Sequence, residues 1–342
     1  IVWVITKKKA PPKMAGQAKQ STSKAKAGLW AHTPPLPLNT SPYFLSPLAL
    51  AAHFKWLYRS WLPITERLIF FCLAFLSWHF FTPHLAAGQG FALEWIALVW
   101  LKNIILMSVL AGGLHLYLYR WGKQADRLKF DRGSANRGGS RFTFNNQVYD
   151  NIFWSLFSGV TIWTGLESLL LWAHANDIGF WIGYSDNIYL FIGLFLVIPM
   201  WNSFWFFCIH RALHWPPLYR LAHHLHHRNV SIGPWSGNAM HPIEHIIWMG
   251  GVLIYLPLAC HPVHFLFSQQ LSILGAVTSH SGYEGLVIGG RKGIRLGDFF
   301  HQLHHRFYEC NYGTAEVGLD KLHGSFHDGE QPPASLQKNR QP

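Results

Sequence analysis

The chain has 342 residues, of which 50% are apolar and only 13% are charged, and it contains 17 Trp and 25 Phe. This composition is too apolar and too aromatic for an ordinary soluble domain, and it indicates an integral membrane protein. The formal net charge of +12 does not indicate nucleic-acid binding, because no nucleic-acid motif is present and the basic residues do not line one amphipathic face.

Both ends of the chain are predicted to lack a fixed structure. Residues 1–45 are rich in Lys, Ala, Ser and Pro, and we expect a disordered basic tail there. We expect a flexible C-terminal tail over 331–342, and membrane helices with a basic cytosolic loop over 46–187.

A helix that spans a membrane needs about 20 mostly apolar residues. Four stretches meet or approach this length, at 66–82, 91–119, 152–173 and 188–209. Two shorter apolar runs, at 246–259 and 263–278, are separated by His261–Pro262, which should break the helix. The sequence therefore predicts an all-α integral membrane protein with about four transmembrane helices and a hairpin that enters the bilayer and returns.

The distribution of charge gives an independent indication of topology. If the N-terminal tail is cytoplasmic and each long run crosses once, the loops at 83–90 and 174–187 face outside, and neither contains Lys or Arg. The loop at 120–150 then faces inside and holds Arg120, Lys123, Arg127, Lys129, Arg132, Arg137 and Arg141. This bias follows the positive-inside rule. Lys102 is the exception, and we expect it to reach outward from the outer end of its helix.

Three clusters of histidine lie on the predicted cytosolic side. The first box is His210 and His214, the second is His223, His226 and His227, and the third is His301, His304 and His305. Residues three and four apart share a helical face, so each box should present its imidazoles together. HxxHH should occur roughly 0.09 times by chance in this composition, yet it occurs twice.

Eight imidazoles on neighbouring helices need partners for their polar atoms, and metal ions are such partners. Eight ligands exceed the four of a tetrahedral zinc ion, so two metals are the natural inference. A redox metal is favoured because the boxes lie at the bilayer surface, where oxidation of a lipid C–H bond requires O2 chemistry. The expected fold is completed by a cytosolic helical cap that carries this histidine-rich site.

The order of the boxes, HxxxH, HxxHH and then HxxHH after a hairpin, resembles the fatty acid hydroxylase/sterol desaturase superfamily of membrane di-iron oxidases. MHPIE at 240–244 resembles an element of the C-4 methylsterol oxidases, and SHSGYE at 279–284 is similar to another segment of the family. HQLHHRFYECNYG at 301–313 and LDKLHGSFHDG at 319–329 resemble its closing segments, although His323 replaces a customary large apolar residue. The resemblance covers about 190–330 and implies a catalytic domain over 188–330.

The resemblance implies the metal ligands position by position. They are His210, His214, His223, His226, His227, His280, His301, His304 and His305. A second set is expected to supply either further ligands or hydrogen bonds to ligands: His241, His245, His224, Glu244, Glu284 and Asp298. His224 has an alternative role as a surface residue, and each of the three acids has one as a helix cap or a solvated carboxylate.

The family resemblance also implies an activity. Such a chain would hold two Fe ions and use O2 to hydroxylate or desaturate a C–H position of a lipid, either sterol-like or fatty-acyl. Electrons would come from a cytochrome or a ferredoxin with its reductase, since we find no dinucleotide, haem or iron–sulfur motif. No nucleic-acid partner is expected. The expected location is a bacterial inner membrane or the endoplasmic reticulum, with the metal site on the cytosolic side.

Two other functions compete with this interpretation. HPIEH at 241–245 matches the HxxEH motif of a zinc metallopeptidase, but Pro242 makes a continuous helix through both histidines awkward, and the eight box histidines stay unexplained. A non-catalytic metal-binding membrane protein or transporter should carry polar residues deep in its helices, where the sequence offers only Glu94, Lys102, His115 and Glu167.

Overall fold

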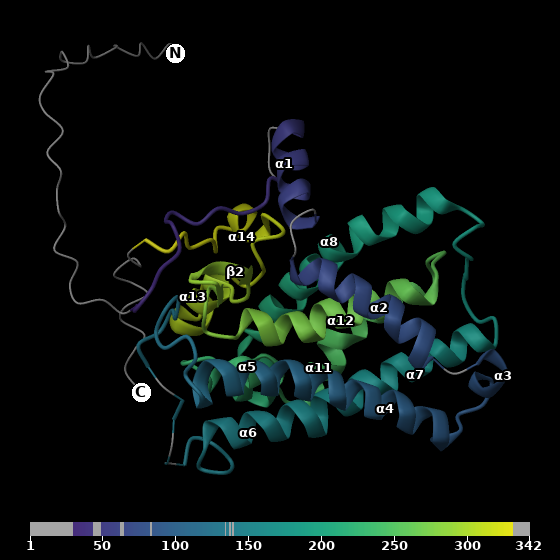
Figure 1. Ribbon diagram of the computed structural model, residues 1–342, viewed down its shortest axis with the longest axis horizontal. Helices are drawn as coiled ribbons and strands as arrows, with labels where there is room; N and C mark the ends of the chain where they lie inside the picture. The colour runs from purple at the N-terminus through teal and green to yellow at the C-terminus, as the bar shows by residue number, and fades with distance from the viewer. Residues whose placement is uncertain are drawn as a thin grey trace, which may run out of the picture.

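The computed structural model describes residues 30–43, 49–61, 65–82, 84–133, 135–136, 138 and 140–330. The tail expected over 331–342 lies outside these residues, as does most of the one expected over 1–45. The described chain is mostly helical, with its long helices running side by side along the longest axis of the molecule (Figure 1).

Three helical stretches are long and apolar enough to cross a membrane: Leu93–Arg120, Gln147–Ala175 and Ile188–Leu213. The first comprises α4 (Leu93–Met107), η1 (Ser108–Gly112), α5 (Gly113–His115) and η2 (Leu116–Arg120). The second comprises α6 (Gln147–Phe153), η3 (Trp154–Val160) and α7 (Thr161–Ala175), and the third is α8 (Ile188–Leu213). The segments η1, η2 and η3 are π-helical turns inside otherwise α-helical rods.

A fourth crossing is formed if two bent helices act as one span. These are α1 (Leu50–Trp61) and α2 (Glu66–Phe81), which are bent by 58° relative to each other. The hydroxyl of Thr65 accepts a hydrogen bond from the backbone N–H of Leu68 and thereby caps α2. The short helix α3 (Leu85–Gly88) follows. The predicted class, a helical membrane protein with about four spans, is confirmed.

The two shorter apolar runs form separate helical segments, as the proline break predicts. The first holds α11 (Pro242–Met249) and the 3-10 helix η6 (Gly250–Tyr255), and the second is α12 (Pro262–Ser279). The side chain of His261 accepts from the backbone N–H of Val263 at the start of α12. Most residues of α12 are buried, because it packs against α2, α7 and α8 in the centre of the bundle. This helix is therefore a core element that leads to the site.

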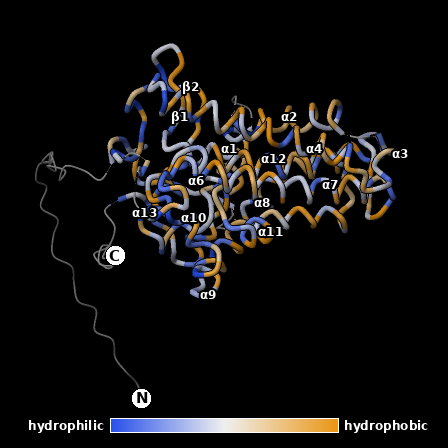
Figure 2. The backbone as a smooth tube through the Cα atoms, turned by 90° about the horizontal axis from the view of Figure 1, so that it is seen from below, coloured by the Kyte–Doolittle hydropathy of each residue, from blue (hydrophilic) through white to orange (hydrophobic). Residues whose placement is uncertain are grey.

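The remaining elements gather at one end of the bundle and form a polar cap, which Figure 2 shows as the more hydrophilic end of the molecule. They are α9 (Pro216–Leu218), η4 (Tyr219–His223), α10 (His224–His227), η5 (Pro234–Asn238), α13 (Phe299–Phe307) and α14 (Leu319–Leu322). The cap also holds an antiparallel hairpin of β1 (Gly285–Ile288) and β2 (Arg291–Arg295), with Val287 opposite Lys292. This hairpin is the one departure from the expected all-helical fold among the described residues.

Residues 30–43 lie against the cap, although they fall within the predicted tail. The backbone N–H of Ala31 donates to the carbonyl of Phe130, and that of Ser41 donates to the carbonyl of Ala315. The Trp30 ring meets the edge of Phe299 with the ring centroids 5.0 Å apart. The tail was expected to be disordered because its composition is rich in Pro and polar residues. Apolar residues within this stretch, such as Trp30, nevertheless pack against the cap.

The expectation that Lys102 reaches outward to the membrane surface is wrong. Lys102 on α4 is buried and forms an ion pair with Glu167 on α7. The second carboxylate oxygen of Glu167 accepts a hydrogen bond from Asn103 at 3.0 Å. A charged partner inside the bundle removes the need for water, so the lysine stays between the helices.

Candidate metal centre

Proline residues and a helix cap position the three boxes. Helix α8 ends at Leu213, one residue before His214, because a new helical segment begins at Pro216 and Pro217. This segment, α9, continues into η4 and α10, which carry the second box. The carboxylate of Asp298 accepts from the backbone N–H of Phe300 and caps α13, which carries the third box. These local features bring the ends of three separate segments to one place in the cap.

The histidines converge in two groups. The five-histidine group consists of His210, His214, His223, His227 and His304, and the four-histidine group consists of His226, His280, His301 and His305. Within each group, one nitrogen from every imidazole lies within 4.8 Å of the corresponding nitrogen of every other member. The structure therefore brings together all nine histidines that the family resemblance implies as ligands.

The second and third boxes each contribute to both groups. His223 and His227 enter the five-histidine group while His226 enters the other, and His304 crosses in the opposite sense from His301 and His305. Each residue advances about 100° around an α-helix, so position i+4 lies about 40° to one side of position i and position i+3 lies about 60° to its other side. One HxxHH box can thus supply two ligands to one ion and one to its neighbour. The spacing of the boxes predicted that each box presents its imidazoles together, and the structure instead divides the second and third boxes between the two groups.

The spacing of the nitrogens fits metal ions. In the five-histidine group, Nε2 of His214 lies 3.1 Å from Nε2 of His227 and 3.1 Å from Nε2 of His304. In the four-histidine group, Nε2 of His280 lies 3.0 Å from Nε2 of His305 and 3.2 Å from Nε2 of His301. Nitrogen ligands that sit about 2.0–2.1 Å from one ion lie about 3 Å from each other, as these do.

The protonation implied by the hydrogen bonds also fits ions. Nδ1 of His304 lies 2.7 Å from the carbonyl of Cys310, and Nδ1 of His280 lies 2.9 Å from the carbonyl of Ala276. A carbonyl only accepts, so each Nδ1 carries the hydrogen and the Nε2 of the neutral ring presents a lone pair to the group. Nε2 of His210 and Nδ1 of His226 are buried without a hydrogen-bond partner. Converging lone pairs and orphaned nitrogens of this kind are the donor set that a cation satisfies.

Burial keeps these imidazoles neutral. It lowers the pKa of His214 to about 2, with a further contribution from His210, and it lowers the pKa of His280 to about 3. The pKa values of His226, His227 and His304 are also held well below the ordinary value, first by burial and then by neighbouring imidazoles. A neutral imidazole is the form that binds a metal ion.

One carboxylate contacts the five-histidine group directly. Oε1 of Glu244, on α11, lies 2.7 Å from Nδ1 of His223, and both side chains are buried. Burial raises the pKa of the Glu244 carboxyl well above its ordinary value. Glu244 thus fixes the orientation of the His223 ring, which is a common arrangement around metal-binding imidazoles.

The other residues of the second set lie outside both groups. His224 is exposed, and Nδ1 of His241 caps α11 by accepting from the backbone N–H of Ile243. His245 is buried between Ser158 and the carbonyl of Asn238. Glu284 contacts His32 and Lys292, which together lower its pKa against the opposing effect of burial. Asp298 acts as the cap of α13.

Sequence reasoning missed two backbone groups that orient histidines. They are the carbonyl of Cys310, which accepts from His304, and the carbonyl of Tyr312, which lies 2.5 Å from Nδ1 of His210. Asn311 between them has a φ of 54° and bonds through its amide to the carbonyls of Phe300 and His327. The Asn-Tyr-Gly that follows the third box was the available signal, because Asn adopts this left-handed conformation more readily than most residues.

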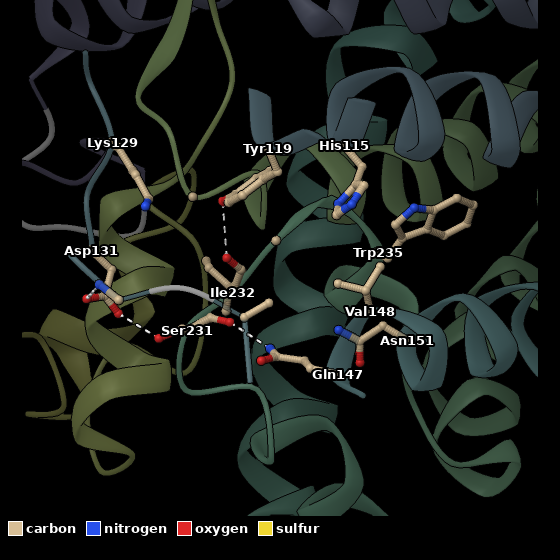
Figure 3. Close-up of a pocket in the computed structure, with 14 residues that line it drawn as sticks. His115, Tyr119, Lys129, Asp131, Gln147, Val148, Asn151, Ser231, Ile232 and Trp235 are labelled. Atoms are coloured by element: carbon tan, nitrogen blue, oxygen red, sulfur yellow. Dashed lines mark hydrogen bonds between the residues drawn. The ribbon is translucent and has the colours of Figure 1, made fainter. Parts of the chain in front are cut away.

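A small cavity that is open to solvent lies between η2, α6 and residues 231–235. Figure 3 shows Tyr119, Gln147, Ser231 and Ile232 around it, joined by hydrogen bonds. The lining residue Gly282 is two positions after His280, and Ser231 is four positions after His227. The cavity wall is thereby continuous with segments from both groups.

The fold and the paired histidine groups define a class, the helical membrane proteins with two histidine groups that could each hold a metal ion in a polar cap. Within that class, residues 195–325 match the model of the fatty acid hydroxylase family. The predicted resemblance is confirmed.

Curated relatives match part of the chain. The Delta(7)-sterol-C5(6)-desaturase of Nicotiana tabacum is 28% identical over 160 residues, which cover 46% of this chain and 55% of the relative. The Delta(7)-sterol 5(6)-desaturase of Saccharomyces cerevisiae is 30% identical over 118 residues, which cover 34% of this chain and 31% of the relative. The chain therefore spans less than two thirds of the length of these relatives. No solved structure matches it.

Proposed function

We propose that the protein is a membrane-bound di-iron oxygenase that hydroxylates or desaturates a C–H position of a lipid, using O2 and electrons supplied from outside. The observation that carries the proposal is the convergence of nine histidines, all but the partly exposed His214 buried, into two groups at the polar end of the membrane helices. We assign the ligand roles to these nine histidines, with Glu244 holding the ring of His223.

A sterol-like lipid is the substrate class that we favour. The two relatives described above are both sterol desaturases by name. An apolar substrate of this kind can reach a site beside membrane helices by moving laterally from the bilayer.

The chain's own residues hold and shield the reacting centre. When bound, two iron ions would supply the reduction of O2 and the oxidation of the C–H bond. The five-histidine and four-histidine groups would bind them, while burial of His226, His227 and His304 excludes bulk water. Hydroxylation consumes O2, two electrons and two protons and yields an alcohol and one water. Desaturation consumes the same reactants and yields a double bond and two waters.

We also propose the orientation and the division of the chain. The loop at 120–150 contains seven basic residues, whereas that at 174–187 contains none, which favours a cytosolic cap. All nine proposed ligands fall between His210 and His305, which supports a catalytic domain over 188–330 preceded by membrane helices over 46–187.

The test is expression with a cytochrome or ferredoxin and its reductase, followed by mass spectrometry of the lipids. We expect a product that is 16 mass units heavier or 2 lighter than its precursor, as addition of one oxygen or loss of two hydrogens requires. His226→Ala and His304→Ala should abolish the product and lower the iron content. His224→Ala is the matched control, because His224 is exposed in the same box and belongs to neither group. Full activity in both test variants would refute the assignment.

The geometry does not favour the zinc peptidase alternative. His241 caps α11 and His245 bonds to Ser158, and neither belongs to a histidine group among the described residues. A transporter should carry polar residues along a path through its helices. Two of the four candidates, Lys102 and Glu167, instead pair with each other in a contact between helices. The oxygenase is the function that uses the two groups as the structure arranges them.

A further inference from the structure

The β-hairpin lies between two histidines of the same group. His280 precedes β1 and His301 follows β2, and both belong to the four-histidine group. The base of the hairpin is clamped to the His280 segment by backbone hydrogen bonds from Gly297 to Tyr283 and from Asp298 to Ser279. The hairpin is therefore joined at its base to the two segments that carry His280 and His301.

The hairpin and the loop before it form one basic surface. Gln124 joins them, since its side-chain amide donates to the carbonyl of Gly285 and accepts from the N–H of Val287. Arg127 adds a hydrogen bond to the carbonyl of Gly290 at the hairpin turn. We call the exposed basic residues of this unit the basic face: Lys123, Arg127, Arg291, Lys292 and Arg295.

The basic face carries a strong excess of positive charge. The exposed acidic residue beside these basic residues is Asp126. Glu284 is mostly buried and is already paired with Lys292 and His32, so its charge is largely offset. Ile288 is the one large apolar side chain that is well exposed within the hairpin. Trp121, two residues before Lys123, is also exposed, as are Trp215 and Leu221 on the opposite edge of the cap, near α9 (Figure 2). The feature that distinguishes this face is therefore its charge, and a positively charged face suits an acidic protein.

A short connection leads from the basic face to the four-histidine group. The hydroxyl of Tyr283 donates to the carbonyl of Ala125 at 3.0 Å, and Tyr283 is three residues after His280. The hydroxyl of Tyr119, which Figure 3 shows beside Ile232, donates to the carbonyl of Ser281 at 2.7 Å. The basic face and the four-histidine group are thus linked through these hydrogen bonds and the few residues of chain between His280 and Tyr283.

We propose that the basic face is the docking surface for an acidic one-electron carrier protein that reduces the site through the four-histidine group. This inference rests on the proposed function. Each turnover needs two electrons, so the carrier must be oxidised twice by one electron each. Positive charge opposite an acidic carrier would raise its rate of association by about 10-fold or more at low ionic strength.

The experiment uses the iron-loaded full chain in lipid discs of neutral phosphatidylcholine, with the soluble haem domain of an acidic cytochrome as the probe. Lys123→Glu/Arg291→Glu reverses two charges and leaves the structural contacts of Arg127 and Lys292 intact. We expect the Kd for the cytochrome, and its apparent KM, to rise by about 10-fold at low ionic strength, and the difference to shrink as salt is added. Iron content and kcat at saturating cytochrome should not change.

Arg220→Glu is the matched control, because Arg220 is exposed next to α9 on the opposite edge of the cap. An equal loss in this variant, or wild-type binding in the double variant, would overturn the proposal. So would a defect seen only in discs that contain anionic lipid, since the basic face would then serve the membrane. Failure of the wild type to bind the probe would overturn it as well. Binding is measured without turnover, so a chain that docks the carrier but oxidises no lipid refutes the proposed function alone.

Discussion

Nδ1 of His223 and Oε1 of Glu244 lie 2.7 Å apart, and the other carboxylate oxygen of Glu244 is buried without a partner. Glu244→Ala removes the acceptor that fixes the His223 ring, so we expect metal affinity in the five-histidine group to fall by about 10–100-fold. Glu244→Gln keeps an acceptor oxygen and should lose less. Metal competition with a chelator measures the affinities. Glu284→Ala is the control, because its carboxylate contacts Lys292 and His32. Equal affinities in all three variants would disprove the positioning role.

His226 and His227 are consecutive residues that serve different groups, with their ring planes 82° apart. The double variant His223→Ala/His227→Ala damages one group, so we expect about one ion per chain to remain. His226→Ala/His227→Ala damages both groups and should leave almost none. Metal analysis of the purified proteins distinguishes the two. If both double variants retained the same metal content, the two groups would not bind independently.

The buried pair of Lys102 and Glu167 should stabilise the contact between α4 and α7. Lys102→Met or Glu167→Leu alone leaves a buried charge without its partner, and we expect a loss of about 3–5 kcal/mol in the free energy of unfolding. The double variant Lys102→Met/Glu167→Leu removes both charges and should recover most of the loss. Unfolding in detergent micelles measures all three. A double variant that is less stable than either single variant would contradict this account.

The metal-free protein should lose stability as the pH falls below neutrality. Burial lowers the pKa of His214 to about 2 and that of His280 to about 3, whereas an unfolded histidine has a pKa of about 6.5. Below about pH 6.5 the unfolded chain binds more protons than the folded one, so the stability rises with pH and is complete above that value. The Tm in chelator should therefore fall between pH 7.5 and pH 5.5. His280→Gln should flatten this dependence and His224→Gln should not. An equal slope in both would contradict the assignment.

The sequence was sufficient for features that depend on local chemistry. Pro262 predicted the break between the two shorter apolar runs, and the long apolar runs predicted the spans. The spacing of the boxes and the family resemblance identified the nine histidines that converge. Pro and helix periodicity act within a few residues, so they can be read without the rest of the fold.

Features that depend on contacts between distant residues could not be predicted. The division of each box between two groups depends on where α8, α10, α12 and α13 meet, which no spacing encodes. The pairing of Lys102 with Glu167 requires the packing of α4 on α7, and without it the lysine was expected at the surface. The carbonyls of Cys310 and Tyr312 carry no side-chain signal for their role.

The two groups also differ in where their members lie along the chain. Four of the five histidines in the first group fall within 210–227, whereas three of the four in the second fall within 280–305. Translation therefore delivers most of one group well before the other, and neither is whole until the third box has left the ribosome. A prematurely terminated product that lacks the third box would have neither group complete, so any ion that needs both groups could be bound only after the third box has been made.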